Sequence, residues 1–281
     1  MTDPLVSADE LCGLLGQDEP RVTVLDVRYQ MGGPGGLHEY AAGHVPGAAY
    51  VVLDTDLADP PGVRGRHPLP AQVTFEAAMR RVGVRGDRPV VVYDDWAGRA
   101  AARCWWLLRF HGHADVRVLD GGWSAWQRAG GEVETGVITV APGTFVADPG
   151  HLAVLEIDDV LAFAESGTLV DARAPERFRG EVEPVDPVAG HIPGAVNVPT
   201  GANLRPDGTF LSAEQIRIVY DTARRNADGD VAAYCGSGVT AAHNLLALTR
   251  AGVDAALYAG SWSEWVADAS RPVETTLSSD G

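Results

Sequence analysis

Basic residues are scarce in this sequence of 281 residues, which has 22 Lys and Arg against 38 Asp and Glu and a net charge of −16. Such an acidic chain has no overall field that attracts a polyanion, which argues against nucleic acid or a membrane surface as partner. Long apolar runs are also missing, so we expect no membrane-spanning helix. The N-terminus lacks the basic segment that begins a signal peptide, and we expect a cytoplasmic protein.

Cysteine is rare as well, with three widely separated residues, Cys12, Cys104 and Cys235. Because they form no Cys-x-x-Cys pair, the sequence has no pattern for a zinc site or a redox dithiol, and we expect no metal or other cofactor. In a reducing compartment the three residues are free thiols. Cys12 and Cys104 lie in helical, apolar-patterned segments and are expected to be core or inert residues, which leaves Cys235 as the candidate nucleophile.

The chain contains an internal repeat, in which four short motifs occur twice in the same order, about 140 residues apart. The pairs are residues 24–28 with 169–173, 43–48 with 190–195, 90–93 with 231–234, and 122–126 with 261–265. Such a pattern is typical of a domain duplicated in tandem. We predict an N-terminal domain at residues 1–135, a Pro- and Gly-containing linker at 136–150, and a C-terminal domain at 151–281.

Each half alternates short apolar runs with amphipathic segments. Runs rich in β-branched and small apolar residues predict strands at residues 22–27, 90–93 and 116–119, and at 169–171, 231–234 and 255–258. Helical spacing predicts helices at 75–82, 100–110, 212–226 and 239–251. This alternation indicates α/β domains, each with a parallel sheet flanked by helices.

The loops that follow the matched Tyr93 and Tyr234 differ in chemistry, because the first begins with Asp94 and the second reads Cys-Gly-Ser-Gly-Val-Thr from Cys235. Ligands of parallel sheets bind at the carboxyl ends of the strands, where both loops lie. Glycines let successive backbone N–H groups turn inward, and together with the start of the next helix these groups favour an anion. A thiolate at Cys235 would be stabilised there and would act as a nucleophile.

The Cys-Gly-Ser-Gly-Val-Thr loop, the Gly-His-x-Pro-Gly-Ala segments, the Asp-x-Arg strand ends and the closing Trp-Ser-x-Trp resemble the tandem-domain rhodaneses over nearly the whole chain. Within that family the loop is most similar to that of the 3-mercaptopyruvate sulfurtransferases. The resemblance implies two rhodanese-like domains, an inactive N-terminal one with Asp94 in the position of the cysteine and a catalytic C-terminal one. It implies that Cys235 takes sulfur from a small anionic donor as a persulfide and passes it to a thiol, such as thioredoxin, or to cyanide.

An anionic donor needs a local cation, and Arg177 and Arg179 are the candidates. Arg177 matches the arginine that clamps the donor in the family, and a planar guanidinium can hold a carboxylate or sulfonate through two hydrogen bonds. The remaining donor-binding residues are expected in the cysteine loop. They are Gly236, Gly238, Val239 and Thr240.

Two departures from the family bear on the donor. Asp186 stands where the mercaptopyruvate enzymes typically have a second arginine, as in the thiosulfate enzymes. Gly236 and Ser237 are neutral, where thiosulfate enzymes usually carry basic residues. Because the neutral loop contacts the transferred sulfur, we expect 3-mercaptopyruvate to be favoured, with thiosulfate as the alternative donor.

The mercaptopyruvate enzymes also imply a serine–histidine–aspartate relay, which Ser237, His67 and Asp56 would form here. The last two would reach across from the N-terminal domain. His44 and His191 occur in both halves, including the half without the cysteine, and are therefore expected to be structural.

Two other functions compete with this one. A cysteine phosphatase of the cell-cycle type has the same fold but needs an arginine six positions after its cysteine, where this chain has Ala241. A non-catalytic rhodanese module that carries sulfur or binds partners is the other alternative, against which the intact loop at Cys235 argues. The acceptor is not encoded in a recognisable motif, and we expect a monomer or weak dimer.

Overall fold

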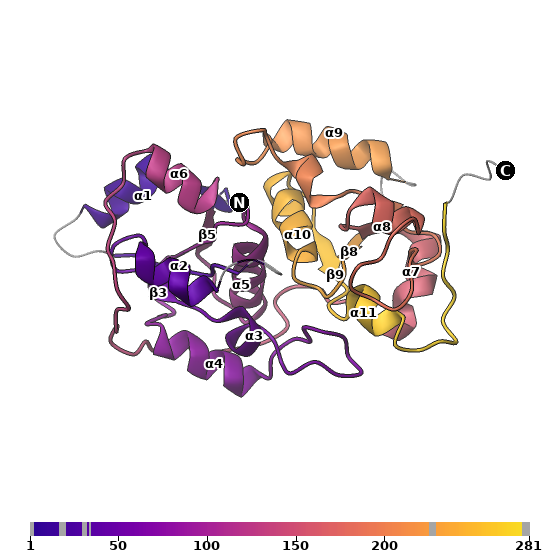
Figure 1. Cartoon of the computed structure of the whole chain (residues 1–281), viewed down its shortest axis with the longest axis horizontal. Helices are drawn as coiled ribbons and strands as arrows, with labels where there is room; N and C mark the ends of the chain where they lie inside the picture. Colours follow the sequence, from indigo (N-terminus) through magenta and orange to yellow (C-terminus); the bar gives the residue numbers. More distant parts are fainter. Residues whose placement is uncertain (1–2, 17–20, 30–32, 34, 225–228, 277–281) are drawn as a thin grey trace. The chain divides into compact units, whose positions relative to one another are not determined.

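The computed structural model describes residues 3–16, 21–29, 33, 35–224 and 229–276. The chain divides into two compact units (Figure 1). Unit 1 comprises Met1–Asp59, Leu69–Leu152 and Arg205–Phe210, and unit 2 comprises Pro60–Pro68, Ala153–Leu204 and Leu211–Gly281. Among the described residues no helix has both the length and the apolar character needed to cross a membrane.

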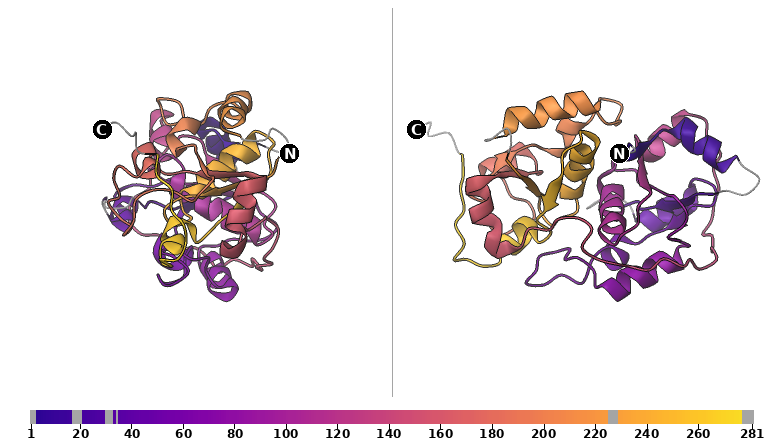
Figure 2. Two further views of the ribbon diagram at one scale, coloured as in Figure 1. Left: turned by 90° about the vertical axis from the view of Figure 1, so that its right-hand side faces the viewer. Right: turned by 180° about the vertical axis from the view of Figure 1, so that it is seen from behind.

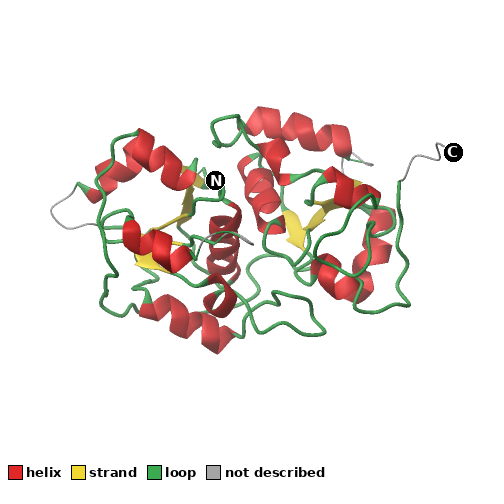
Figure 3. Ribbon diagram, viewed as in Figure 1, coloured by secondary structure: helices red, strands yellow, loops and turns green. Residues whose placement is uncertain are grey.

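Unit 1 is built on a five-stranded, fully parallel sheet in the order β1-β5-β4-β2-β3. Its strands are β1 (Leu5–Val6), β2 (Thr23–Asp26), β3 (Ala49–Tyr50), β4 (Val90–Tyr93) and β5 (Val116–Leu119). Its helices are α1 (Ala8–Leu15), α2 (Gly36–Ala42), α3 (Leu53–Asp56), α4 (Gln72–Arg81), α5 (Arg99–Phe110) and α6 (Gly122–Arg128). The helices lie around the strands, with α5 packed against β4 and β5 (Figure 3).

Unit 2 repeats this plan with a four-stranded parallel sheet in the order β7-β6-β8-β9. Its strands are β6 (Thr168–Asp171), β7 (Val196–Asn197), β8 (Val231–Tyr234) and β9 (Ala255–Leu257). Its helices are α7 (Val160–Ser166), α8 (Pro175–Arg179), α9 (Ala213–Ala223), α10 (Ala241–Arg250) and α11 (Ser261–Trp265), with short 3₁₀ turns η1 (Ile157–Asp159) and η2 (Thr200–Asn203). Helix α10 packs against β8 and β9, and α9 lies beside it (Figure 2).

The repeated sequence motifs meet in space and hold each unit together. In unit 1 the buried pair Asp26–Arg28 (2.8 Å) places the guanidinium over the ring of Trp123, 4.6 Å from its centroid. In unit 2 Arg173 pairs with Asp171 (2.6 Å) and lies 4.5 Å from the centroid of Trp262. A buried charge is tolerated only when it is paired and hydrogen-bonded, which explains why each Asp-x-Arg strand end occurs together with a Trp-x-x-Trp helix.

The histidines that occur in both halves are structural, as expected. His44 is fully buried, stacks on Tyr40 with ring centroids 4.0 Å apart, and its Nδ1 lies 3.0 Å from the Tyr40 carbonyl. His191 stacks on Phe178 at 3.7 Å, with Nδ1 2.7 Å from the Phe178 carbonyl. Each ring therefore joins its Gly-His-x-Pro-Gly segment to a preceding helix, α2 in unit 1 and α8 in unit 2.

The predicted α/β class with parallel sheets is confirmed, and most predicted strands and helices occur within one to three residues of their predicted bounds. The predicted helix 212–226 is α9, for which Ser212 and Gln215 form a capping box, while residue 226 lies outside the described residues. The helix predicted at 239–251 begins only at Ala241, because the preceding residues wrap around the Cys235 side chain. The two-residue strands β1, β3 and β7 are too short to form a sequence pattern and were not predicted.

Two expectations concern the other cysteines. Cys104 lies in the core, as predicted, and burial raises the pKa of its thiol far above the ordinary value. Cys12 is partly buried and packs against the hydrophobic core of unit 1, which agrees with the expectation of a core or inert residue. It lies on α1, a helix of eight residues that turns only Ala8 and Leu11 fully inward.

Candidate active site

Cys235 directly follows β8, a central strand of the second sheet, so its side chain lies at the carboxyl end of the strands. Its N–H donates to Ser261 Oγ at 3.0 Å, and its Sγ accepts a hydrogen bond from the Gly238 N–H at 3.1 Å. The residue is 1% exposed. A sulfur held against a backbone N–H is stabilised when it carries negative charge, whether as a thiolate or as a persulfide.

The backbone conformation of Ser261 supports this position of Cys235. Ser261 has φ +56°, in the left-handed region that is costly for a residue with a side chain. Its hydroxyl accepts from the Cys235 N–H and donates to the Tyr258 carbonyl at 2.9 Å. The matching residue of unit 1 is Gly122, with φ +55°. Unit 2 therefore has a strained serine where unit 1 has a glycine, and its hydroxyl holds the backbone N–H of Cys235.

The backbone requires a glycine at position 238, whereas the glycine at 236 leaves space that two side chains occupy. Gly238 has φ +77°, and a Cβ at this position would lie 2.1 Å from the Ala259 carbonyl oxygen. A Cβ at Gly236 would lie 2.9 Å from Nη2 of Arg66 and 3.7 Å from Nη1 and Nη2 of Arg177. Gly236 thus lets two guanidinium groups approach the backbone immediately beside the nucleophile.

The corresponding loop of unit 1 has an anion of its own in this place. Oδ1 of Asp94 accepts from the N–H groups of Trp96 (2.9 Å) and Gly98 (2.8 Å), and Oδ2 accepts from Ala101 (2.8 Å). Burial raises the pKa of the Asp94 carboxyl, and these hydrogen bonds oppose the shift. The loop after the central strand therefore directs its amides at an acceptor in both units, a carboxylate in one and a sulfur in the other.

Arg177, on α8, is held by Glu183. Its Nε donates to Oε2 at 3.0 Å and its Nη2 to Oε1 at 2.6 Å. Oε1 also accepts from the N–H groups of Val185 and Asp186, each at 3.1 Å. Burial alone would raise the pKa of Glu183, but the hydrogen bonds from Arg177 and the backbone outweigh it and lower the pKa. One edge of the Arg177 guanidinium is thereby fixed.

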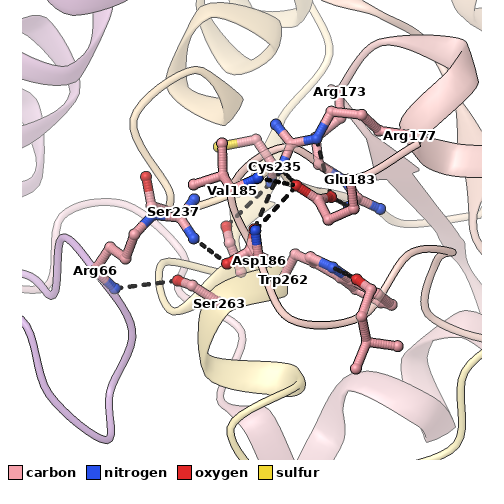
Figure 4. A network of polar contacts seen from close by, with 12 residues as sticks. Arg66, Arg173, Arg177, Glu183, Val185, Asp186, Cys235, Ser237, Trp262 and Ser263 are labelled. Carbon is pink, nitrogen blue, oxygen red and sulfur yellow. Dashed lines mark hydrogen bonds and ion pairs between the residues drawn. The ribbon is translucent and has the colours of Figure 1, made fainter. Parts of the chain in front are cut away.

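Asp186 joins this arginine to a second one. Its Oδ2 accepts from Arg177 Nη2 at 3.2 Å, and its Oδ1 is paired with Arg66 Nη1. Figure 4 shows both guanidinium groups joined to this carboxylate close to Cys235. Burial raises the pKa of Asp186, and the charge of Arg66 opposes the shift.

Ser237 and His67, two members of the expected relay, lie together. Ser237 Oγ is 2.8 Å from His67 Nδ1, and both residues belong to unit 2 because the segment 60–68 packs within that unit. Asp56 belongs to unit 1, where its Oδ2 accepts from the Val52 N–H at 2.7 Å and pairs with Arg81 at 2.5 Å. The role of Asp56 in a relay stays a prediction.

The other expected donor-binding residues occupy different environments. Val239 is buried, and Thr240 is the N-cap residue that directly precedes α10. Arg179 lies two positions after Arg177 on α8, roughly 200° around the helix axis. It is exposed and pairs with Glu181 at 2.7 Å. Its guanidinium is therefore directed away from the partners of Arg177.

Sequence reasoning missed Arg66, Glu183 and Ser261. Ser261 could have been found, since its aligned partner in the repeat is Gly122. In the sequence Asp186 stands out only as the absence of an arginine, although a carboxylate in that place requires a cation from elsewhere. Arg66, at a sequence separation of 120 residues, is that cation.

A family model described as the rhodanese-like domain matches residues 7–129 and again 156–268. SseB of Mycobacterium tuberculosis, which carries the name of a thiosulfate sulfurtransferase, is 48% identical, with 96% of each chain covered. A probable 3-mercaptopyruvate sulfurtransferase of Pseudomonas aeruginosa is 46% identical over 96% of this chain and 98% of its own.

Among solved structures, SseA of Escherichia coli, described as a 3-mercaptopyruvate sulfotransferase with the rhodanese fold, matches with a TM-score of 0.82. It is 35% identical, with 93% of this chain and 100% of that chain covered. The relatives carry names for both donors, so the likeness assigns the family and leaves the donor open. With its two matched domains and its cysteine loop after β8, the chain belongs to the rhodanese family.

Proposed function

We propose that this chain is a sulfurtransferase that moves a sulfur atom from a small anionic donor, through a persulfide on Cys235, to a thiol or to cyanide. The observation that carries the proposal is the position of Cys235 Sγ, which accepts the Gly238 N–H beside a backbone position flanked by two guanidinium groups. Three unpaired cysteines fit a reducing, cytoplasmic location with a thiol acceptor such as thioredoxin.

The first half-reaction loads the cysteine. The Cys235 thiolate attacks the sulfur of 3-mercaptopyruvate, a sulfur–sulfur bond forms, and the carbon–sulfur bond breaks. The electron pair of the broken bond leaves with the organic fragment as the enolate of pyruvate, which then takes up a proton. The Gly238 N–H can stabilise the negative charge on the cysteine in the thiolate and the persulfide.

The second half-reaction removes the outer sulfur from Cys235. The thiolate of an acceptor attacks the outer sulfur, the sulfur–sulfur bond to Cys235 breaks, and the electron pair returns to Cys235 as a thiolate. With cyanide the product is thiocyanate. Ser237 and His67, 2.8 Å apart beside the cysteine, are the groups proposed to transfer the proton that the enolate takes up, with Asp56 as the predicted third member of that relay.

Local charge supports 3-mercaptopyruvate over thiosulfate as the donor. The two cations next to Gly236, Arg66 and Arg177, are matched by two carboxylates, Glu183 and Asp186. A site with so little excess positive charge suits a donor with one carboxylate better than a dianion. Thiosulfate stays the alternative donor.

The test is thiocyanate formation from cyanide with each donor, measured on one preparation. We expect kcat/KM for 3-mercaptopyruvate to exceed that for thiosulfate by at least about tenfold, and Cys235→Ser to lower turnover at least about 1,000-fold. Cys12→Ser is the matched control, because Cys12 is a partly buried thiol in the other unit. Turnover by Cys235→Ser at the wild-type rate would refute the proposal.

The same experiment distinguishes a sulfur carrier from a sulfurtransferase. A carrier would gain the mass of one sulfur atom on Cys235 when mixed with a donor, yet would form no thiocyanate in repeated turnovers. A tenfold preference for thiosulfate would instead leave the sulfurtransferase proposal standing and overturn the donor assignment.

A further inference from the structure

The segment 60–68 carries an arginine to the cysteine loop of unit 2. The Arg66 N–H donates to Ser263 Oγ at 3.1 Å, and Gly65, with φ +97°, lies so close to Gly260 that a Cβ there would be 2.7 Å from its carbonyl oxygen. The backbone at Gly65 and at the Arg66 N–H therefore lies against the start of α11. Figure 4 shows this contact with Ser263 and the side chain of Arg66 extending to Asp186.

The two terminal nitrogens of the Arg66 guanidinium face different groups, one Asp186 and the other the cysteine loop. Nη1 pairs with Asp186, whereas Nη2 lies where a Cβ on Gly236 would approach it to 2.9 Å. Its side chain is 28% exposed and that of Arg177 is 15% exposed, whereas Asp186 is 3% exposed. The two cations thus keep access to solvent while the carboxylate that holds them is covered.

This arrangement differs from that of an arginine whose role is structural. Arg173 is 1% exposed and donates to Asp171, to the Gly190 carbonyl and to Glu183. Arg66 is more exposed, and its Nη2 end lies at Gly236, the residue that follows the nucleophile. A cation placed beside the reacting sulfur interacts with any anion that approaches it.

We propose that Arg66 is a donor-binding residue, a second cation that holds the anionic group of the sulfur donor together with Arg177, and that Asp186 is the residue that positions it. The inference rests on the proposed sulfurtransferase function and adds to it a specificity-determining side chain from the segment 60–68. The donor class is a small molecule with a carboxylate or a similar planar anion, which fits between two guanidinium groups.

A first experiment measures the effect of local charge at Cys235 and does not require enzymatic turnover. The rate of Cys235 alkylation is measured with the anionic iodoacetate and with the neutral iodoacetamide, by peptide mass spectrometry. The ratio of the iodoacetate rate to the iodoacetamide rate cancels differences in access to the thiol. The Cys12 peptide of the same molecules serves as an internal reference. Arg66→Ala should lower the ratio at Cys235 about fivefold and leave it unchanged at Cys12.

The control variant is Arg271→Ala. Arg271 belongs to the same unit, is 21% exposed and pairs with Asp158 at 2.9 Å, so it matches Arg66 in exposure and in ion pairing. In Arg271→Ala the ratio of the two alkylation rates at Cys235 should equal that of the wild type. Thermal unfolding of each variant verifies that it is folded.

A second experiment measures donor binding in turnover. Arg66→Ala should raise KM for 3-mercaptopyruvate about tenfold while kcat falls less than about threefold, and Arg66→Lys should recover part of the lost affinity. If Asp186 acts by positioning Arg66, Asp186→Asn and the double variant Asp186→Asn/Arg66→Ala should have the same KM within about twofold.

Each outcome decides one part of the proposal. An unchanged alkylation ratio in Arg66→Ala overturns the assignment of Arg66, even if the protein proves inactive with every donor. A lowered ratio with an unchanged KM shows a cation that attracts an approaching anion but does not hold the bound donor, and overturns donor binding. Fully additive effects of the two substitutions on KM overturn the positioning role of Asp186. Absence of turnover in the wild type refutes the proposed function and leaves the alkylation result to judge Arg66.

Discussion

At the scale of single residues, two carboxylates hold the arginines of the candidate site in place. Glu183 receives hydrogen bonds from Arg177, Arg173 and two backbone N–H groups, and its side chain is 3% exposed. Its loss removes the acceptor of several partly buried donors, which costs more than the net worth of each hydrogen bond. Glu183 therefore contributes both to the stability of unit 2 and to the orientation of Arg177.

We predict that Glu183→Gln lowers the free energy of unfolding by about 1–3 kcal/mol at pH 7. Because the folded state lowers the pKa of Glu183, its carboxylate stabilises the protein at pH values above its unfolded pKa, about 4.3. This stabilisation is lost as the pH falls through the lower pKa of the folded state. The difference between wild type and variant should therefore shrink below about pH 4 in urea denaturation.

Glu181→Gln is the control for this prediction, since Glu181 is two residues away, exposed, and paired with the exposed Arg179. Exposed ion pairs contribute little, so this variant should unfold like the wild type. A difference between Glu183→Gln and wild type that stays constant between pH 7 and pH 3 would show that the ionised carboxylate is not what stabilises the fold.

At the scale of elements, the loop after the central strand is an anion-binding device present in both units. In unit 2 the Gly238 amide faces a sulfur, and in unit 1 three amides face the Asp94 carboxylate. The duplicated chain has kept the geometry of the loop and changed the group inside it. Unit 1 thus contains, as a fixed side chain, the charge that unit 2 would carry on its reacting sulfur.

Asp94→Asn should lower the free energy of unfolding by about 1–3 kcal/mol, because its Nδ2 would face an amide donor where Oδ2 now accepts the Ala101 N–H. Thiocyanate formation per folded molecule should stay within about twofold of wild type, since Asp94 belongs to the unit without the nucleophile. Urea denaturation and the cyanide assay provide the two measurements. The neighbouring Asp95 is exposed, and Asp95→Asn should change neither quantity.

The sequence predicts those parts of the fold and of the candidate site that depend on short-range residue patterns. The strands that precede Asp94 and Cys235 and the glycines that follow the cysteine carry short-range patterns, so the nucleophile and its loop can be placed from the sequence alone. Arg66 cannot, since it lies in a segment without helix or strand periodicity and its partner Asp186 is 120 residues away. The segment 60–68 packs with unit 2 through contacts such as Arg66 to Ser263 Oγ, which no sequence pattern indicates.

At the scale of the whole molecule, the net charge of the chain repels an anionic donor, whereas the two guanidinium groups of the proposed donor site attract it at short range. The net charge is −16, whereas the groups at Gly236 are two guanidiniums. At 10 mM salt the screening length is about 30 Å, so the whole surface repels an anion, and at 0.15 M it is about 8 Å, so mainly the nearby groups act on it. Short contacts with Arg66 and Arg177 are screened far less than this long-range repulsion.

We therefore predict that kcat/KM for 3-mercaptopyruvate rises about two- to threefold between 10 mM and 0.15 M sodium chloride, the reverse of what cationic steering alone would produce. Alkylation of Cys235 by the neutral iodoacetamide, measured over the same range, should stay constant and so controls for effects of salt on the protein itself. A steady fall of kcat/KM with salt would mean that the field at the loop extends beyond the screening length and that the acidic surface does not oppose the approach of the donor. In Arg66→Ala only one nearby cation opposes the long-range repulsion, so the rise of kcat/KM with salt should be steeper than in the wild type.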